Sequence, residues 1–70
     1  MLKQRRKELG LTLKEMAERM NVTAPQIHHY EDYTRFPNAK EIITLRNAYQ
    51  MSDEELIKYL EEINKLEKDK

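Results

Sequence analysis

Apolar side chains recur at three- and four-residue steps along most of the chain, and polar side chains fill the positions between them. This spacing places the apolar residues on one face of a helix, which is typical of amphipathic helices packed against a core. Each segment is too short to be a stable helix alone, so packing between segments must supply most of the stability. The expected core contains Leu9, Leu11, Met16, Ala17, Met20, Val22, Ile27, Tyr30, Ile42, Leu45, Ala48, Tyr49, Leu56 and Leu60.

Four positions carry the sequence signal for the start of a helix. A capping residue stands three residues before Glu or Gln in Thr12–Glu15, Thr23–Gln26, Asn38–Glu41 and Ser52–Glu55. The first side chain accepts a hydrogen bond from a free N–H group of the opening turn, and the Glu or Gln side chain accepts one from the N–H of the cap. Each signal precedes a segment with helical apolar spacing, so the sequence predicts four helix starts.

The expected helix ends agree with these starts. Gly10 and Asn21 follow two of the apolar segments, and they are the residue types that best adopt the left-handed conformation after a helix. Residues 33–37 have no helical pattern, which indicates a loop. The sequence predicts an all-α protein, a compact five-helix bundle, with helices at about 2–9, 13–20, 24–32, 39–50 and 53–66. We expect one domain over residues 1–66 and a frayed charged tail over residues 67–70.

The link between the second and third predicted helices is very short. Met20 ends one helix, Asn21 and Val22 form the link, and Thr23 caps the next helix. Two helices joined in this way cross steeply and need a small side chain at the crossing, which Ala17 supplies. This pattern predicts a helix-turn-helix, in which the second helix faces the major groove of DNA.

The residues of this corner and its surroundings carry a resemblance to a known family. They are Arg6, Gly10-Leu11-Thr12, Glu15-Met16-Ala17, Asn21-Val22-Thr23, Ile27, Tyr30-Glu31 and Pro37. Over nearly the whole chain, the sequence resembles the phage-repressor/Cro-like helix-turn-helix domains of transcription regulators. The resemblance implies a five-helix bundle with a recognition helix over residues 24–32 that enters the major groove of double-stranded DNA. It also implies a largely buried ion pair between Arg6 and Glu31.

By the same resemblance, bases are contacted from the positions that Ala24, Pro25 and His29 hold in this sequence. Ala24 and Pro25 carry no hydrogen-bonding side chain and are limited to apolar contacts, for instance with a thymine methyl group. Gln26 can hydrogen-bond adenine, and His28 and His29 can donate to guanine or phosphate, which completes the expected base-reading set. The residues expected to bind phosphate are Lys14, Thr23, Arg35, Asn38 and Lys40.

The charge of the chain changes sign along its length. Thirteen basic and thirteen acidic side chains give a net charge of zero, unlike the basic excess typical of nucleic-acid binders. Residues 1–50 hold nine basic and six acidic side chains, a net charge of +3, whereas residues 51–70 carry a net charge of −3. The modest basic excess of the first part favours a homodimer, which doubles the basic surface and contacts two half-sites.

The last predicted helix has apolar residues at steps of three, four and three, namely Leu56, Tyr59, Ile63 and Leu66. The pattern covers fewer than two heptads, which is too short for a coiled coil. We expect Leu56 and Leu60 to pack on the domain, and Tyr59, Ile63 and Leu66 to form part of a dimer surface.

His28 and Asp32 lie one helical turn apart and are two potential metal ligands. The adjacent His28 and His29 side chains point about 100° apart on a helix, and the sequence offers no evident third ligand. We therefore expect no metal site, and we interpret the histidines as base or phosphate contacts.

The sequence lacks the residue patterns of enzymes and membrane proteins. It has no Cys, only one Gly, and no nucleophile paired with a base, so we expect no enzymatic activity, no cofactor and no small-molecule substrate. No apolar segment is long enough to cross a membrane.

Two functions agree with these observations. The first is a sequence-specific, double-stranded DNA-binding transcription regulator, a repressor-like homodimer in the cytoplasm that associates with the nucleoid when bound. The alternative is a protein-binding module of the same fold, an antirepressor or antitoxin-like partner with weak or no DNA binding. The apolar residues Leu13, Ala24 and Pro25, together with the zero net charge, favour the alternative.

Overall fold

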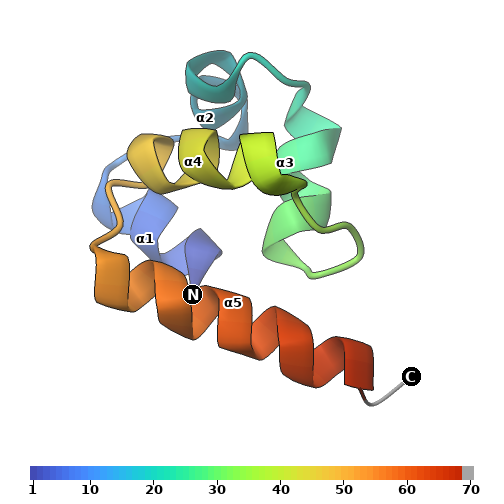
Figure 1. The fold of residues 1–70 in the computed structure, drawn as a ribbon. Helices are drawn as coiled ribbons and strands as arrows, with labels where there is room; N and C mark the ends of the chain where they lie inside the picture. The colour runs from blue at the N-terminus through green and yellow to red at the C-terminus, as the bar shows by residue number, and fades with distance from the viewer. Residues whose placement is uncertain (69–70) are drawn as a thin grey trace.

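Five α-helices and no strand make up the described part of the chain, which in this computed structural model is the backbone of residues 1–68 and the side chains of residues 1–66. The helices are α1 (Leu2–Glu8), α2 (Leu13–Met20), α3 (Ala24–Glu31), α4 (Ala39–Ala48) and α5 (Asp53–Lys68). The longest, α5, runs along one side of the molecule (Figure 1). The all-α prediction is confirmed; α5 continues two residues past its predicted end, and residues 69–70 of the expected tail lie outside the described residues.

Four of the five helices, α2 to α5, begin at the predicted caps. Complete reciprocal bonding occurs in Thr12–Glu15, Asn38–Glu41 and Ser52–Glu55, where the cap side chain and the acidic side chain each accept from the other residue's N–H group. Thr23 also accepts from the N–H of Gln26, at 3.4 Å. The Gln26 side chain, however, bonds other residues. Only one of the two reciprocal capping bonds therefore forms at the start of α3.

Four of the helices end in the same left-handed turn. Gly10, Asn21, Tyr33 and Gln50 have φ values of 73°, 57°, 62° and 52°. In each case the following N–H group bonds back to the carbonyl five residues earlier, for example Val22 to Ala17 at 3.0 Å, which is the Schellman arrangement. The sequence predicted this turn at Gly10 and Asn21, but gave no signal at Tyr33 and Gln50 because neither residue type favours a positive φ.

One core joins all five helices. Its fully buried side chains include Tyr30 from α3 and Leu45 from α4, and Val22 packs against it from the helix-turn-helix link. Ala17 and Ile27 are buried where α2 meets α3, as the short link predicted. Four buried residues, Leu2, Met51, Tyr59 and Ile63, were absent from the core expected from the apolar spacing. The full set of buried core residues is Leu2, Met16, Ala17, Met20, Ile27, Tyr30, Leu45, Ala48, Tyr49, Met51, Tyr59 and Ile63.

The expected dimer surface on α5 is corrected by the burial of two of its residues. Tyr59 is 0% exposed and Ile63 is 9% exposed, so both belong to the core of a single chain. The Tyr59 ring lies 6.2 Å from the Tyr33 ring, between centroids. Leu56 and Leu60 also pack on this core, because steps of three and four residues place all four side chains on one face of α5. Leu66 alone of the expected dimer residues is exposed, at 39%.

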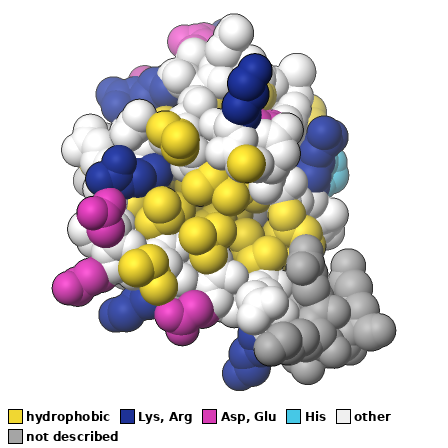
Figure 2. Space-filling view, viewed as in Figure 1, with side chains coloured by type: hydrophobic (Ala, Val, Ile, Leu, Met, Phe, Trp, Pro, Cys, Tyr) yellow, Lys and Arg dark blue, Asp and Glu magenta, His cyan; other side chains and the backbone are white. Residues whose placement is uncertain are grey.

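Apolar side chains also gather on the outer face of the molecule seen in Figure 2, with charged side chains around them. The exposed large apolar residues of α4 and α5 are Ile43, at 62%, Ile57, at 54%, and Leu66. Of these residues, Leu66 alone belongs to the dimer surface that the sequence predicted. In the described part of the chain, no helix combines the length and the apolar character needed to cross a membrane.

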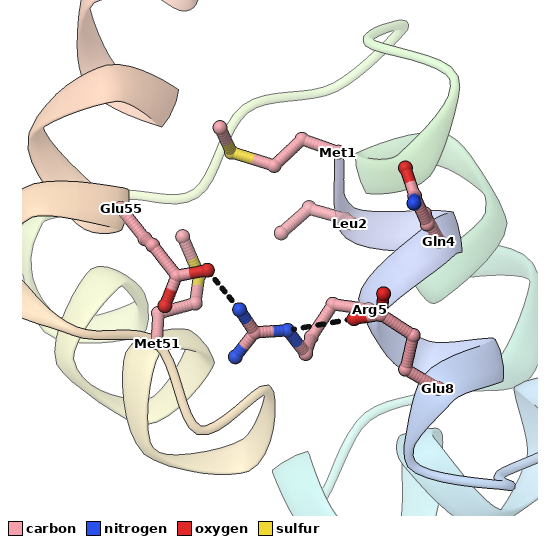
Figure 3. Close-up of a pocket in the computed structure, with 7 residues that line it drawn as sticks. All are labelled: Met1, Leu2, Gln4, Arg5, Glu8, Met51 and Glu55. Carbon is pink, nitrogen blue, oxygen red and sulfur yellow. Dashed lines mark hydrogen bonds and ion pairs between the residues drawn. The ribbon is translucent and has the colours of Figure 1, made fainter.

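Arg5 fixes α5 against α1. Its guanidinium bonds the Glu55 carboxylate of α5, and its Nε lies 3.3 Å from Glu8 on its own helix (Figure 3). Arg5 Nη1 also donates to the Gln50 carbonyl oxygen at 2.8 Å. Arg5 thereby connects α1 to the turn before α5 and to the first turn of α5.

Candidate nucleic-acid interface

The helix-turn-helix of α2 and α3 presents one side of α3 outward. Among the described residues, these two helices make the most extensive helix–helix contact, and Ile27 and Tyr30 are buried in the core. Pro25, His28 and His29 lie on the opposite, exposed side of α3. The fold therefore leaves a short helical face free for a ligand.

The expected base-reading residues do not all lie on this face. Pro25, His28 and His29 are exposed, whereas Ala24 and Gln26 are half-buried. Ala24 packs against the core, which restricts its contribution to the surface. The exposed face is thus centred on the histidines.

Gln26 takes part in a hydrogen-bond network between α3 and α4. Its Nε2 donates to Tyr30 Oη at 2.7 Å and to Glu41 Oε2 at 3.2 Å, while Tyr30 Oη donates to the same carboxylate. The Tyr30 bond, followed by the bond from the Asn38 N–H, lowers the pKa of Glu41. The amide nitrogen of Gln26 is therefore engaged within the protein. The sequence missed this network because its partner Glu41 lies fifteen positions away.

A second polar cluster lies at the end of α3. His28 Nδ1 is 3.5 Å from Asp32 Oδ2, and His29 Nδ1 is 3.0 Å from Thr34 Oγ1. Thr34 donates to Asp32 Oδ1 from its hydroxyl at 2.6 Å and from its N–H at 3.0 Å. The Thr34 hydroxyl bond is the main cause of the lowered pKa of Asp32, to which both histidines also contribute. Asp32 therefore carries its negative charge beside the two imidazoles.

All five residues expected to bind phosphate are exposed: Lys14, Thr23, Arg35, Asn38 and Lys40. Thr23 and Asn38 accept hydrogen bonds at the starts of α3 and α4 through their side-chain oxygens. Capping leaves the hydroxyl hydrogen of Thr23 and the amide hydrogens of Asn38 to donate outward. Both caps thus combine a structural bond with a donor suited to phosphate.

An ion pair fixes the orientation of α3 from inside. Arg6 Nε donates to Glu31 Oε2 at 2.8 Å and Arg6 Nη2 donates to Glu31 Oε1 at 3.1 Å, with side-chain exposures of 10% and 5%. The Tyr49 hydroxyl also donates to Glu31, at 2.8 Å, and Arg6 donates to the Leu11 carbonyl. The structure thus contains the pair implied by the resemblance, and it adds Tyr49, which the sequence showed only as an apolar-face residue.

The comparison with protein families agrees with this geometry. Residues 1–62 match the family described as a helix-turn-helix domain, which covers nearly the whole chain and is not a family of enzymes. Neither the search of curated proteins nor that of solved structures gave a match. Given five helices, the α2–α3 corner and a match over this length, the chain belongs to the helix-turn-helix domain family, of the Cro/C1 type.

Proposed function

We propose that this protein is a sequence-specific, double-stranded DNA-binding transcription regulator that acts as a repressor and inserts α3 into the major groove. The observation that carries the proposal is the exposed face of Pro25, His28 and His29 on a helix fixed from behind by the Arg6–Glu31 pair. In helix-turn-helix domains the second helix lies in the major groove and contacts base edges, and the free outer side of α3 suits this role.

The proposed contacts follow from side-chain chemistry. His28 and His29 donate hydrogen bonds to guanine or phosphate, and Pro25, with the exposed part of Ala24, contacts a thymine methyl group. Gln26 contributes to base reading through its carbonyl oxygen, since its amide nitrogen is engaged by Tyr30 and Glu41. Phosphates are bound by the exposed flanking residues Lys14, Thr23, Arg35, Asn38 and Lys40.

We further propose that the protein binds DNA as a homodimer in the cytoplasm, associated with the nucleoid. One short recognition helix reads only a few base pairs, and a second copy doubles both the reading surface and the basic charge. The exposed apolar residues Ile43 of α4 and Ile57 and Leu66 of α5 are available for contact with a second copy and support self-association. Sedimentation of Ile43→Lys and Ile57→Lys tests this: the variants are expected to be monomeric, and a dimer unchanged by both substitutions argues against this surface.

Random-site selection with the purified protein, followed by titration of the enriched site at two salt concentrations, tests DNA binding. The proposal predicts an enriched sequence and an affinity that falls steeply with salt. His29→Ala is expected to weaken the selected site by about 1–3 kcal/mol, and Lys58→Ala on α5 is the control expected to leave affinity unchanged.

The alternative function, a protein-binding module, predicts a different result in the same experiment. Two observations favour it over simple DNA reading: the engaged amide of Gln26 and the negative charge of Asp32 beside the histidines. If no site is enriched at low salt, the DNA-binding proposal is wrong, and the protein-binding module becomes the better account of the exposed face.

A further inference from the structure

Both histidines of the chain lie in one cluster with a carboxylate. The chain contains two His, and His28, His29 and Asp32 each offer one ligand atom within 4.8 Å of the others. The sequence suggested that adjacent imidazoles diverge on a helix and that a third ligand was missing. In the structure the two ring centroids are only 6.0 Å apart, and Asp32, at the end of α3, lies beside both.

Thr34 orients two of these three groups. Its hydroxyl and its N–H both donate to Asp32 Oδ1, which leaves Oδ2 facing His28 Nδ1. Since the hydroxyl hydrogen goes to Asp32, Thr34 Oγ1 accepts from the Nδ1–H of His29. The lone pair of the neutral His29 ring is then on Nε2. Hydrogen bonds of this kind, from a residue behind the ligands, fix the tautomer and orientation of groups that bind metals.

The distances in the cluster are close to those of a metal site. Ligands bonded to Zn²⁺ at about 2.1 Å in a tetrahedron lie about 3.4 Å from one another. His28 Nδ1 and Asp32 Oδ2 are separated by 3.5 Å. The three ligand atoms, one from each residue, lie within 4.8 Å of one another and need to move closer together to bind one ion.

We propose that His28, His29 and Asp32 form a binding site for a divalent transition-metal ion of the Zn²⁺ class. Two imidazoles and one carboxylate suit zinc, copper and nickel, whereas Mg²⁺ and Ca²⁺ prefer sites built from oxygen atoms. All three side chains are exposed, so water completes the coordination.

Metal binding at this site does not require DNA, although the site lies on the face proposed to read bases. An occupied site withdraws both imidazoles from bases, and this consequence rests on the proposed function. The metal site itself is therefore tested with zinc alone, so that failure to bind zinc and failure to bind DNA are separate results.

Calorimetric titration of the full chain with zinc chloride is the direct experiment, with magnesium chloride as the comparison. We expect saturable binding of one Zn²⁺ per chain and no saturable binding of Mg²⁺. His28→Ala, His29→Ala and Asp32→Asn should each weaken zinc binding by about tenfold or more. Glu54→Gln, which removes one exposed carboxylate from α5, should bind zinc as the unmodified chain does.

The imidazole resonances of the unmodified protein, followed by NMR during the same titration, give a second measurement that needs no variant. Saturating shifts of both histidines at one equivalent of Zn²⁺ support the site. Absence of saturable binding at millimolar zinc, resonances that do not move, or binding unaffected by loss of both imidazoles overturns the proposal.

Discussion

Arg6 of α1 and Glu31 of α3 form a bidentate ion pair inside the domain, through bonds of 2.8 and 3.1 Å. Both side chains are almost fully buried, and the Tyr49 hydroxyl donates to the same carboxylate. The pair joins the first helix to the helix proposed to read DNA. A buried pair of this kind adds little net stability, but loss of one partner leaves an uncompensated charge in the core.

Arg6→Met is therefore expected to destabilise the protein by about 3–5 kcal/mol, because Glu31 stays buried without its partner. Urea unfolding followed by circular dichroism measures the change. The double variant Arg6→Met/Glu31→Leu removes both charges and should recover most of this loss. A single variant that costs no more than the double variant would contradict the account of the pair.

Two buried tyrosines provide a matched test of hydrogen bonding. Tyr49 donates to Glu31, whereas the Tyr59 hydroxyl is buried with no hydrogen-bond partner among the described residues. Tyr49→Phe should cost about 1.5–3 kcal/mol because it removes a bond to a charged group. Tyr59→Phe should raise the free energy of unfolding by about 1 kcal/mol because it removes an unsatisfied polar atom from the core. Equal losses in the two variants, measured by urea unfolding, would refute this difference.

Gln50 adopts a left-handed backbone conformation, with φ at 52°. This conformation is energetically unfavourable for any residue that carries a side chain. Gln50→Gly should raise the free energy of unfolding by about 1 kcal/mol, because Gly removes that cost while the Arg5 bond to the carbonyl of residue 50 remains. Gly10→Ala is the opposite control: the added Cβ meets nothing within 4 Å, so the expected loss of about 1 kcal/mol is backbone strain alone. Thermal unfolding of both variants checks that stability rises in Gln50→Gly and falls in Gly10→Ala.

Glu41 should make the free energy of unfolding depend on pH in the acid range. Its pKa in the folded protein is lowered, first by the hydrogen bond from Tyr30, so its contribution is present above the pKa of the unfolded state. That contribution is lost as pH falls through the lower folded-state pKa. Glu41→Gln keeps an acceptor for Tyr30 but has no charge to lose.

The expected result is a stability difference between wild type and Glu41→Gln that is constant near neutral pH and shrinks in acid. Urea unfolding across this pH range measures it. Glu18→Gln on the exposed side of α2 is the control, and an equal acid dependence in both variants would show that Glu41 is not responsible.

Lys14 and Lys40 should contribute to DNA affinity through phosphate alone. Replacing either with Ala should weaken binding to selected and unrelated DNA equally. It should also reduce the slope of log affinity against log salt concentration by about 1. Fluorescence anisotropy at several salt concentrations measures the slope. A loss confined to the selected site would instead assign the lysine to base reading.

The candidate site was predictable where its signals are local. Thr23 as a cap, Ile27 as an inward residue and the outward His28 and His29 all follow from spacing along a single helix. The bonds of Gln26 to Tyr30 and Glu41 and the position of Thr34 behind Asp32 were not predictable from spacing. They depend on how α3 meets α4 and on the left-handed turn at Tyr33.

The sequence by itself determined where four of the five helices begin, where α1 and α2 end, and how α2 turns into α3. Caps, helix stops and apolar spacing depend on residues within about one turn of one another, so local chemistry is sufficient. Only the tertiary structure decided that Tyr59 and Ile63 are buried, and that the Gln26 amide donates to Glu41 of the next helix. Contacts such as Arg5 with Glu55 join residues fifty positions apart, and only the packing of whole helices brings such side chains into contact.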